Sequence, residues 1–240
     1  MRHARGDRRE RALVFDVNET LLDLRALAPH FEKIFGDGAV FSEWFAQVVQ
    51  SALLTVVAGP YYDFGQVGRS ALGMVAARHG VTLTDEDRGR LLGTMRTLPP
   101  HPDVIPAFEM LKEAGFRMAA LTNSTPEVAD AQLTHAGLKS FLERVMSVDA
   151  VQSLKPAARV YQYAAEQLGV APDEMRLIAA HSWDVAGAMR AGCAAAFVTR
   201  PGMVLDPLFP APDIISPDLL GVAEQLIAAG DQRSAATPDS

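Results

Sequence analysis

From Arg117 onward, short apolar runs alternate with segments whose apolar residues recur every three or four positions. Runs of the first kind are typical of buried strands, and segments of the second kind are typical of helices that bury one face. The expected strands are residues 117–123, 143–148, 175–181 and 194–200, and the expected helices are residues 126–138, 158–169, 182–192 and 217–230. This alternation predicts an α/β, Rossmann-like core in which a parallel sheet carries helices on both faces.

A further expected strand, residues 12–15, ends abruptly at the carboxylate of Asp16. Between it and the helix 103–115 lies a block with a helical pattern and no convincing strand. Its four expected helices are residues 24–36, 42–59, 64–80 and 84–98. A helical block inserted after the first strand of such a sheet is most simply a cap over its active edge, and the proline-rich turn 98–103 returns the chain to the core.

These patterns divide the chain into a core, a cap and two tails. Residues 12–24 and 101–229 are assigned to the α/β core, and residues 25–100 are assigned to the helical cap. The arginine-rich residues 1–11 are interpreted as a solvated, disordered tail rather than an anion-binding arm. Residues 230–240 are polar and are also expected to be disordered.

Composition excludes several classes of protein. Hydrophobic residues make up 49% of the chain and charged residues 21%, which is typical of a folded protein with a sizeable core. The net charge of −7 argues against nucleic-acid binding, which would need a basic face. No apolar run approaches the roughly 20 residues that span a bilayer, so no membrane partner is expected. The single cysteine, Cys193, excludes an internal disulfide and favours the reducing cytoplasm.

Ligands of a parallel sheet bind outside the carboxyl ends of its strands, so the residues that follow each strand are the first candidates for chemistry. Four such places are residues 16–20, residues 122–124, the loop around Lys155, and residues 181–184. Together they bring an acid, a hydroxyl with an amide, an amine and a second acid to one edge. Because four strand ends bring such groups together, a catalytic site explains them better than a separate structural role for each residue.

Each of these residues also has a structural explanation when it is taken alone. Asp16 could cap the next helix, and Thr122 with Asn123 could do the same. Lys155, which precedes a proline, could be a solvated loop residue. Asp184 lies in the first turn of an expected helix, where a carboxylate favours the helix dipole without any catalytic role. A histidine at a strand end, such as His181, is more often a packing or hydrogen-bonding residue, and Trp183 is expected to line a pocket rather than react.

Four segments resemble, in order and spacing, the motifs of the haloacid dehalogenase superfamily: DVNETLLD, LTNS, LKPAARVYQYA and the WD of AAHSWD. They are most similar to its type II branch, the L-2-haloacid dehalogenases. The resemblance runs from about Ala12 to the final helix and includes the cap. It implies a small-molecule substrate. Because relatives with this cap often dimerise, it also implies a homodimer, although the sequence alone does not fix the oligomeric state.

Most members of that superfamily are magnesium-dependent phosphatases, and two positions argue against that activity. Phosphatases place a second aspartate two residues after the nucleophile, where this chain has Asn18, which cannot exchange a proton near neutral pH. They also place an acidic residue four before the last aspartate of the fourth motif, where this chain has Ala180. Magnesium needs hard oxygen ligands, so we expect neither a metal nor another cofactor.

The resemblance implies a metal-independent hydrolase in which Asp16 attacks the halogen-bearing carbon of a short 2-haloalkanoic acid, halide leaves and an ester forms. Water then attacks the Asp16 carbonyl and releases a 2-hydroxy acid. Asp184 would orient or deprotonate that water, and Lys155 would hold both carboxylates ionised. The residues implied in substrate binding are Val17, Asn18, Thr20, Phe45, Thr122, Asn123, Tyr161, His181 and Trp183.

Several of these residues have specific implied roles. Thr20 would fix one Asp16 oxygen, and Thr122 with nearby backbone N–H groups would bind the substrate carboxylate. Asn123 would contribute to the halide pocket, Tyr161 would donate a hydrogen bond, and Trp183 would form a wall of the pocket.

The chain departs from the dehalogenase pattern in its cap and in its fourth motif. Well-studied dehalogenases carry an arginine directly after a cap tryptophan to receive the halide, but Phe45 follows Trp44 here. A hydroxyl and an amide of the fourth motif are replaced by Ala179 and His181, and a protonated His181 could supply the missing positive charge. These departures leave a second hypothesis open, a binding or regulatory protein that kept the fold and lost efficient turnover.

Overall fold

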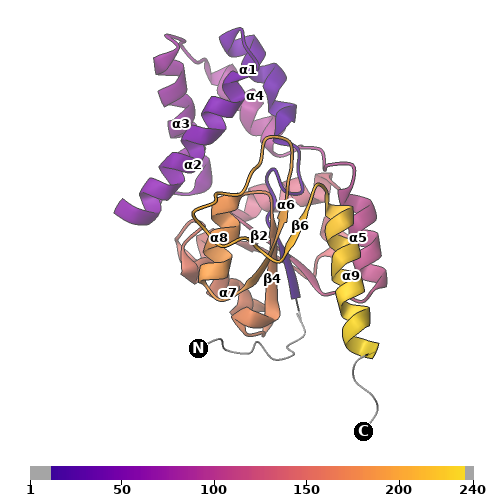
Figure 1. The fold of residues 1–240 in the computed structure, drawn as a ribbon. Coiled ribbons are helices and arrows are strands. Elements are labelled where there is room, and N and C mark those ends of the chain that lie inside the picture. Colours follow the sequence, from indigo (N-terminus) through magenta and orange to yellow (C-terminus); the bar gives the residue numbers. More distant parts are fainter. Residues whose placement is uncertain (1–11, 236–240) are drawn as a thin grey trace.

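The computed structural model describes residues 12–235, and within them the core is one six-stranded parallel sheet (Figure 1). The order of the strands in space is β3-β2-β1-β4-β5-β6. In chain order they are β1 (Ala12–Phe15), β2 (Met118–Thr122), β3 (Arg144–Ser147), β4 (Met175–Ala179), β5 (Ala194–Val198) and β6 (Ile214–Ser216). β1 therefore lies inside the sheet, paired with β2 on one side and β4 on the other. The predicted parallel α/β sheet is confirmed.

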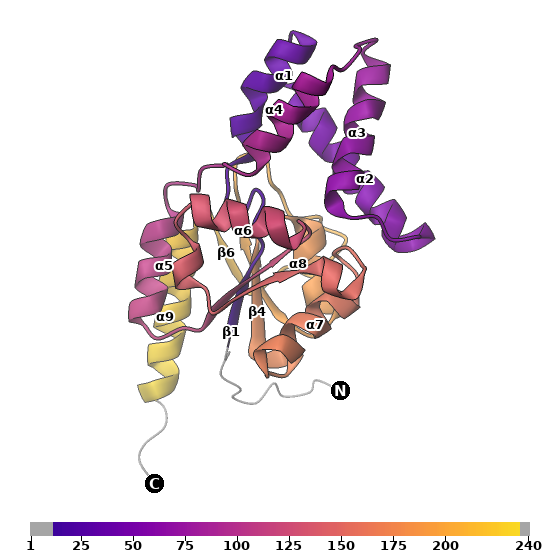
Figure 2. The same ribbon diagram turned by 180° about the vertical axis from the view of Figure 1, so that it is seen from behind.

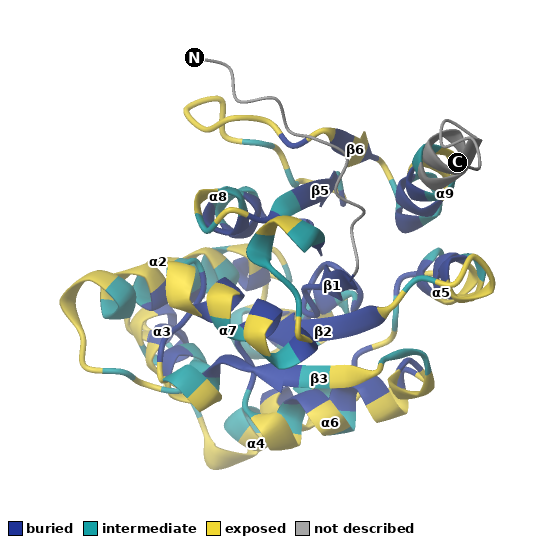
Figure 3. Ribbon diagram, turned by 90° about the horizontal axis from the view of Figure 1, so that it is seen from below, coloured by how far each residue is buried: buried dark blue, intermediate teal, exposed yellow. Residues whose placement is uncertain are grey.

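Helices cover both faces of this sheet, as the sequence predicted. Successive side chains of a strand point to opposite faces, and β1 follows this rule. Leu13 and Phe15 pack in the hydrophobic cluster that contains α5 (Val104–Glu113) and α9 (Leu219–Ala235), whereas Val14 packs with α7 (Ala158–Leu168) and α8 (Ser182–Arg190). α6 (Pro126–His135) lies along β3, and Figure 3 shows the inner strands buried between these helices.

The cap lies over the carboxyl edge of the sheet, as Figures 1 and 2 show from opposite sides. It contains a 3-10 turn, η1 (Leu24–Leu27), followed by α1 (Ala28–Phe35), α2 (Val40–Ala58), α3 (Phe64–Arg78) and α4 (Asp85–Met95). The starts of α3 and α4 are fixed by capping boxes, in which Asp63 pairs with Gln66 and Thr84 pairs with Asp87. α2 and α3 pack against each other, and the Trp44 indole donates a hydrogen bond of 3.1 Å to the Gly68 carbonyl.

Two boundaries differ from the sequence-based prediction. β6 was missed because a strand of three residues, preceded by Pro210 and Pro212, is too short to show a period of two. α9 continues to Ala235, although residues 230–240 were predicted to be a tail; Gly230 disfavours a helix by about 1 kcal/mol but does not by itself end one. The predicted tail at residues 1–11 and the last five residues lie outside the described part of the chain.

One helix among the described residues, α2, is long and apolar enough by length and composition to cross a membrane. The sequence-based prediction was that no apolar run approaches that length. It overlooked α2 because Glu43 interrupts the apolar residues, although the mean hydropathy of the helix still reaches 1.3. A core helix of a folded domain satisfies the same test, and α2 packs here against α1 and α3 of the cap.

Candidate active site

Asp16 lies one residue beyond β1, at the edge of the sheet that faces the cap. Its backbone N–H donates to the Ile178 carbonyl at 3.0 Å, so Asp16 continues the hydrogen-bonded ladder to β4. The side chain is 7% exposed. The strand therefore fixes the position of a carboxylate that is almost entirely surrounded by protein.

Lys155 joins this carboxylate to a second one. Its ammonium Nζ lies 3.0 Å from Asp16 Oδ1 and 2.8 Å from Asp184 Oδ2, and neither Lys155 nor Asp184 has any exposed side-chain surface. Lys155 comes from the loop between η3 (Val148–Val151) and α7, and its backbone N–H donates to Asn123 Oδ1 at 3.0 Å. Three separate strand ends thus meet in one buried ion-pair cluster.

The electrostatics of this cluster keep the first carboxylate charged. Burial raises the pKa of Asp16, but the Lys155 ammonium and the neighbouring His181 outweigh it and hold the pKa well below its usual range. Burial also raises the pKa of Asp184, which Lys155 offsets only in part and Asp16 increases further. Burial lowers the pKa of Lys155, yet the two carboxylates raise it above its usual value overall. The Asp16 carboxyl is therefore held ionised by its neighbours despite its burial.

The two oxygens of Asp16 have different surroundings. Oδ1 contacts Lys155, whereas Oδ2 accepts a hydrogen bond of 2.7 Å from the Thr20 hydroxyl and lies 3.2 Å from His181 Nδ1. The Thr20 oxygen in turn accepts the Ala180 N–H at 2.9 Å, which fixes the direction of its own proton. The predicted contact between Thr20 and an Asp16 oxygen is present.

Behind Lys155, Tyr161 holds the second carboxylate. Its hydroxyl donates to Asp184 Oδ1 at 2.5 Å, while burial and the Asp184 charge raise the pKa of Tyr161 well above its usual value. Tyr161 thus reaches the cluster as a hydrogen-bond donor, but its partner is Asp184. Since Lys155 occupies the other oxygen, both Asp184 oxygens are engaged.

The side chain of Asn18 is held by hydrogen bonds to residues other than Asp16. Its amide Nδ2 donates to Ser124 Oγ at 3.1 Å, and its Oδ1 accepts from Gln132 Nε2 at 3.0 Å. The Thr122 hydroxyl accepts the Ser124 N–H at 3.1 Å, so the turn after β2 is fixed in the same network. An amide at this place supplies no proton transfer near neutral pH, as the sequence indicated.

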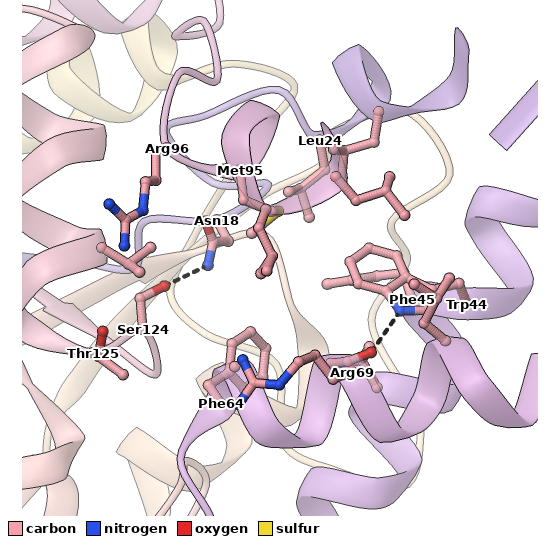
Figure 4. Close-up of a pocket in the computed structure, with 18 of the residues that line it drawn as sticks. Asn18, Leu24, Trp44, Phe45, Phe64, Arg69, Met95, Arg96, Ser124 and Thr125 are labelled. Atoms are coloured by element: carbon pink, nitrogen blue, oxygen red, sulfur yellow. Dashed lines mark hydrogen bonds between the residues drawn. The ribbon is translucent and has the colours of Figure 1, made fainter. Parts of the chain in front are cut away.

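Two cavities meet at this site. Asp16 lines the smaller cavity, which has a volume of about 20 Å³. The larger cavity, of about 580 Å³, lies between the cap and the core (Figure 4). Asn18, Phe45 and Phe64 line both, so they form the passage between them. The small cavity has the volume of about one water molecule in this structure.

Eight of the predicted site residues line the small cavity, which are Asp16, Asn18, Phe45, Thr122, Asn123, Lys155, His181 and Trp183. The other four lie behind it. Val17 packs in the hydrophobic core, so its backbone is the only part that could contact a substrate. Thr20, Tyr161 and Asp184 act on residues of the cavity wall and do not line it, because each is fully buried.

Aromatic rings form one wall of the small cavity. His181 stacks on Trp183 with ring centroids 5.0 Å apart and an interplanar angle of 19°. Phe45 lies 5.6 Å from His181 and brings the cap to the core at the position where the sequence pattern expects an arginine. The cap therefore places an uncharged ring at this position of the small cavity.

Sequence reasoning missed two residues that hold this geometry. Arg200 follows β5 and donates to the Thr20 carbonyl from Nε at 3.2 Å and from Nη2 at 2.9 Å, while its Nη1 pairs with Asp103 at 2.8 Å. A Cβ atom on Gly187 would lie 2.7 Å from the Tyr161 hydroxyl and 2.5 Å from Pro156, so no larger residue fits there. In the sequence, the only signs of these two roles were an arginine at the end of an expected strand and a glycine inside an expected helix.

Glu19, Asp23 and His101 form a second cluster with donor atoms within 4.8 Å of one another, a spacing that could hold a metal ion. Two of these side chains already have partners in the protein. Asp23 receives hydrogen bonds from Arg25, and His101 Nε2 lies 3.0 Å from the Glu19 carbonyl oxygen. The cluster joins the two linkers of the cap, and the expectation of no metal stays a prediction.

A nucleophilic carboxylate, a buried lysine and a second acid under a helical cap define a hydrolase with an aspartate nucleophile. Residues 10–192 match the family model for haloacid dehalogenase-like hydrolases. The (S)-2-haloacid dehalogenase 1 of Pseudomonas sp. strain CBS-3 is 33% identical over 180 residues, covering 74% of this chain and 79% of the relative. The (S)-2-haloacid dehalogenase of Pseudomonas sp. strain YL is 29% identical and covers 89% of this chain and 93% of its own length.

Solved structures agree with this assignment. The L-2-haloacid dehalogenase of Xanthobacter autotrophicus with covalently bound chloropropionic acid has a TM-score of 0.84 and 26% identity, over 90% of this chain and 98% of that one. This chain belongs to the haloacid dehalogenase-like hydrolases, in the branch of the L-2-haloacid dehalogenases.

Proposed function

We propose that this protein is a metal-independent hydrolase of carbon–halogen bonds, which converts a short 2-haloalkanoic acid into a 2-hydroxy acid and halide. The observation that carries the proposal is the ionised Asp16 carboxylate, which is paired with Lys155 and open to a small cavity lined by Thr122, Asn123 and Trp183. A relative with chloropropionic acid covalently bound supports the same chemistry.

In the first step, one Asp16 oxygen displaces the halide from carbon 2 of the substrate and forms an ester. The surroundings of the carboxylate favour Oδ1 as that oxygen, because Oδ2 is already held by Thr20 and His181. Lys155 contacts Oδ1 at 3.0 Å and keeps the carboxylate ionised before the attack. The halide leaves with the bonding electron pair.

Thr122 and backbone N–H groups at the end of β2 would receive the substrate carboxylate, and Asn123 with the rings of Phe45 and Trp183 would surround the halide. Phe45 supplies no positive charge at this place. Charge assistance to a developing anion is often worth several kcal/mol, so we expect slower halide departure than in a relative with a cap arginine.

In the second step, water attacks the Asp16 carbonyl carbon and the 2-hydroxy acid leaves. Asp184 contributes by holding Lys155, through the 2.8 Å contact between its Oδ2 and the ammonium. Tyr161 and Asp184 thus act as positioning residues behind the cavity wall.

The test is halide release in the presence of EDTA, with chloroacetate, bromoacetate, fluoroacetate and each enantiomer of 2-chloropropionate. We expect halide from at least one, and no loss with EDTA. Asp16→Asn should abolish release while the protein still folds, as circular dichroism would show, and the exposed Asp130→Asn is the matched control. Absence of halide from every substrate would refute the proposal and favour a binding or regulatory role, and Mg²⁺-dependent phosphate release would show a phosphatase.

We also propose a homodimer, supported by apolar side chains that α2 leaves exposed, Leu54 at 63% and Val57 at 85%. Sedimentation should give twice the mass of the chain, and Val57→Asp should give a monomer. A monomeric wild-type protein would contradict this. A cytoplasmic location is proposed because the chain has one cysteine, Cys193, and so forms no internal disulfide; fractionation of cells tests it.

A further inference from the structure

The larger cavity continues the space beside the nucleophile. Asn18, Phe45 and Phe64 line both cavities, so a group on carbon 2 of an acid held at Asp16 can extend through this passage. The volume of about 580 Å³ lies within the range of about 300–1,000 Å³ that is typical of pockets for drug-sized ligands. Chloroacetate or chloropropionate would leave most of this space unused. The cavity therefore fits an acid with a longer substituent on carbon 2.

Much of the wall of this larger cavity is apolar. Leu24 and Leu27 come from η1, Leu72 comes from α3, and Leu91 with Met95 comes from α4 (Figure 4). Such a wall favours an alkyl or aryl chain, because apolar surface that enters the cavity is removed from water. The middle part of the substituent is therefore expected to be apolar.

Three arginines also line the larger cavity: Arg69 on α3, Arg88 on α4, and Arg96 directly after α4. Most other arginines among residues 12–229 bind a carboxylate, an amide or a backbone carbonyl. Arg69, Arg88 and Arg96 have no hydrogen bond or ion pair within those residues. Their guanidinium groups are therefore available to a ligand.

The wall of the larger cavity is positive, although the whole chain has a net charge of −7. Among the described residues that line it, Asp63 is the only acid, and its carboxylate caps the start of α3. A Cβ atom on Gly65 would lie 3.4 Å from Arg69 Nη1, so the Arg69 guanidinium folds back along α3 to its first turn. Figure 4 shows this guanidinium beside Phe64, with Arg96 at another side of the same space. An acidic protein thus presents an excess of positive charge to one cavity.

These arginines are not substitutes for the cap arginine that is absent beside Trp44. None of them lines the small cavity, where halide would leave and where Thr122 is expected to receive the carboxylate on carbon 1. Their positive charge therefore faces a different part of the substrate, at the far end of the group on carbon 2. A guanidinium matches a carboxylate with two parallel N–H donors, so a carboxylate is a suitable group for that end.

We propose that the larger cavity is a subsite for the second acidic group of a 2-halo dicarboxylic acid, whose substituent on carbon 2 is an apolar chain that ends in a carboxylate. The halogen-bearing carbon lies at Asp16, the chain follows the passage into the apolar cavity, and the terminal carboxylate pairs with Arg69, Arg88 or Arg96. This inference rests on the proposed function, because it names the class of substrate for the same site.

The direct test compares 2-bromooctanedioate with 2-bromooctanoate, which has the same chain length and lacks the terminal carboxylate. We expect bromide from both, with a KM for the dioate that is lower by about 5- to 10-fold, since each solvent-exposed ion pair contributes only modestly. This KM ratio should fall toward one as the salt concentration rises, because salt screens exposed charges. Equal KM values for the two bromo acids in the wild type at low salt would overturn the proposal.

The triple variant Arg69→Gln/Arg88→Gln/Arg96→Gln should bring the two KM values together, because the terminal carboxylate loses its partners. Circular dichroism should show that it still folds, since these arginines hold no other described residue. Arg190→Gln is the matched control: Arg190 is exposed at the end of α8, has no partner among the described residues, and lines neither cavity. It should keep the wild-type KM ratio. A triple variant that also keeps this ratio would overturn the proposal.

Octanedioate, which carries no halogen, tests the subsite without turnover. By calorimetry it should bind the wild type and the Arg190→Gln control equally, and bind the triple variant about 5- to 10-fold more weakly. Halide release from chloroacetate together with equal octanedioate affinities in the wild type and the triple variant would refute the subsite alone. Absence of halide from every 2-halo acid would instead refute the proposed function, and calorimetry would then decide the subsite by itself.

Discussion

Replacing Lys155 by methionine should destabilise the fold and stop the reaction together. The ammonium lies 3.0 Å from Asp16 and 2.8 Å from Asp184, and all three side chains are buried. Removing one member of a buried ion pair costs about 3–5 kcal/mol, because the remaining charge has neither water nor a partner. The two carboxylates would also repel each other, and one of them should take up a proton rather than remain charged.

That proton limits the loss, so we expect Lys155→Met to lower the free energy of unfolding by about 3–5 kcal/mol at neutral pH rather than twice that amount. Urea unfolding followed by circular dichroism measures it. The control is Lys139→Met, whose ammonium pairs with Asp130 on the surface and should change stability by less than about 0.5 kcal/mol. The double variant Lys155→Met/Asp184→Asn should be more stable than Lys155→Met, because no buried carboxyl then has to take up a proton at neutral pH.

The same variant should change how stability depends on pH. In the wild type, the lowered pKa of Asp16 means that its contribution is complete above the ordinary value of 3.8 and is lost as the pH falls through the folded-state value. Without Lys155, the carboxyl that takes up a proton has a raised pKa, so stability should fall as the pH rises above the ordinary value. A loss below about 1 kcal/mol in Lys155→Met, or a double variant less stable than the single one, would refute the reasoning.

Three further predictions concern residues around the site. Gly187→Ala should cost about 1–3 kcal/mol in urea unfolding and lower activity, since its Cβ would lie 2.7 Å from the Tyr161 hydroxyl and would push it from Asp184; the open Gly73→Ala is the control, and equal stability of the two would contradict this. The cavity of about 580 Å³ should admit the alkyl chain of 2-bromohexanoate, so Gly68→Leu should raise the KM for 2-bromohexanoate and leave the KM for chloroacetate unchanged. Gly68→Ala, whose Cβ would meet Trp44 at 3.8 Å, is the control and should change neither KM. If Gly68→Leu had the same KM for 2-bromohexanoate as the wild type, the alkyl chain would not enter this cavity. Arg200→Met should cost about 3–5 kcal/mol, measured by urea unfolding, because Asp103 and the Thr20 carbonyl lose a buried partner; an unchanged midpoint would mean that water replaces the guanidinium.

The sheet and the position of the nucleophile could be predicted because they depend on local pattern. Short apolar runs identify the strands and a period of 3.6 residues identifies the helices, and a parallel sheet brings all its strand ends to one edge. That argument alone places Asp16, Lys155 and Asp184 near one another. It does not give distances, and it cannot show which of them face the cavity.

The remaining features depend on contacts between segments far apart in the chain. Arg200 lies 180 residues from Thr20, so no local pattern connects them. The close fit of Gly187 against Tyr161 follows from how α7 packs on α8, and a glycine in a helix has no distinguishing mark in the sequence. The contact of His181 Nδ1 with Asp16 was also hidden, because a sequence names the residue but not the partners of its two nitrogens.

The two linkers that join cap and core run side by side and are fastened to each other. Asp23 N–H donates to the Pro99 carbonyl and His101 N–H donates to the Leu21 carbonyl, both at 2.9 Å. Below them, the Arg200 guanidinium binds Thr20 in one linker and Asp103 at the foot of the other.

This arrangement sets the place where the molecule can bend. A cap that swings open to admit substrate must pivot above the fastened linkers, since motion below them would break the bonds made by Arg200. Such a motion would leave the fastened linkers in place, and with them the orientation of Asp16. Phe45 belongs to the cap, so the same motion would carry it away from His181 and remove one ring from the wall of the small cavity.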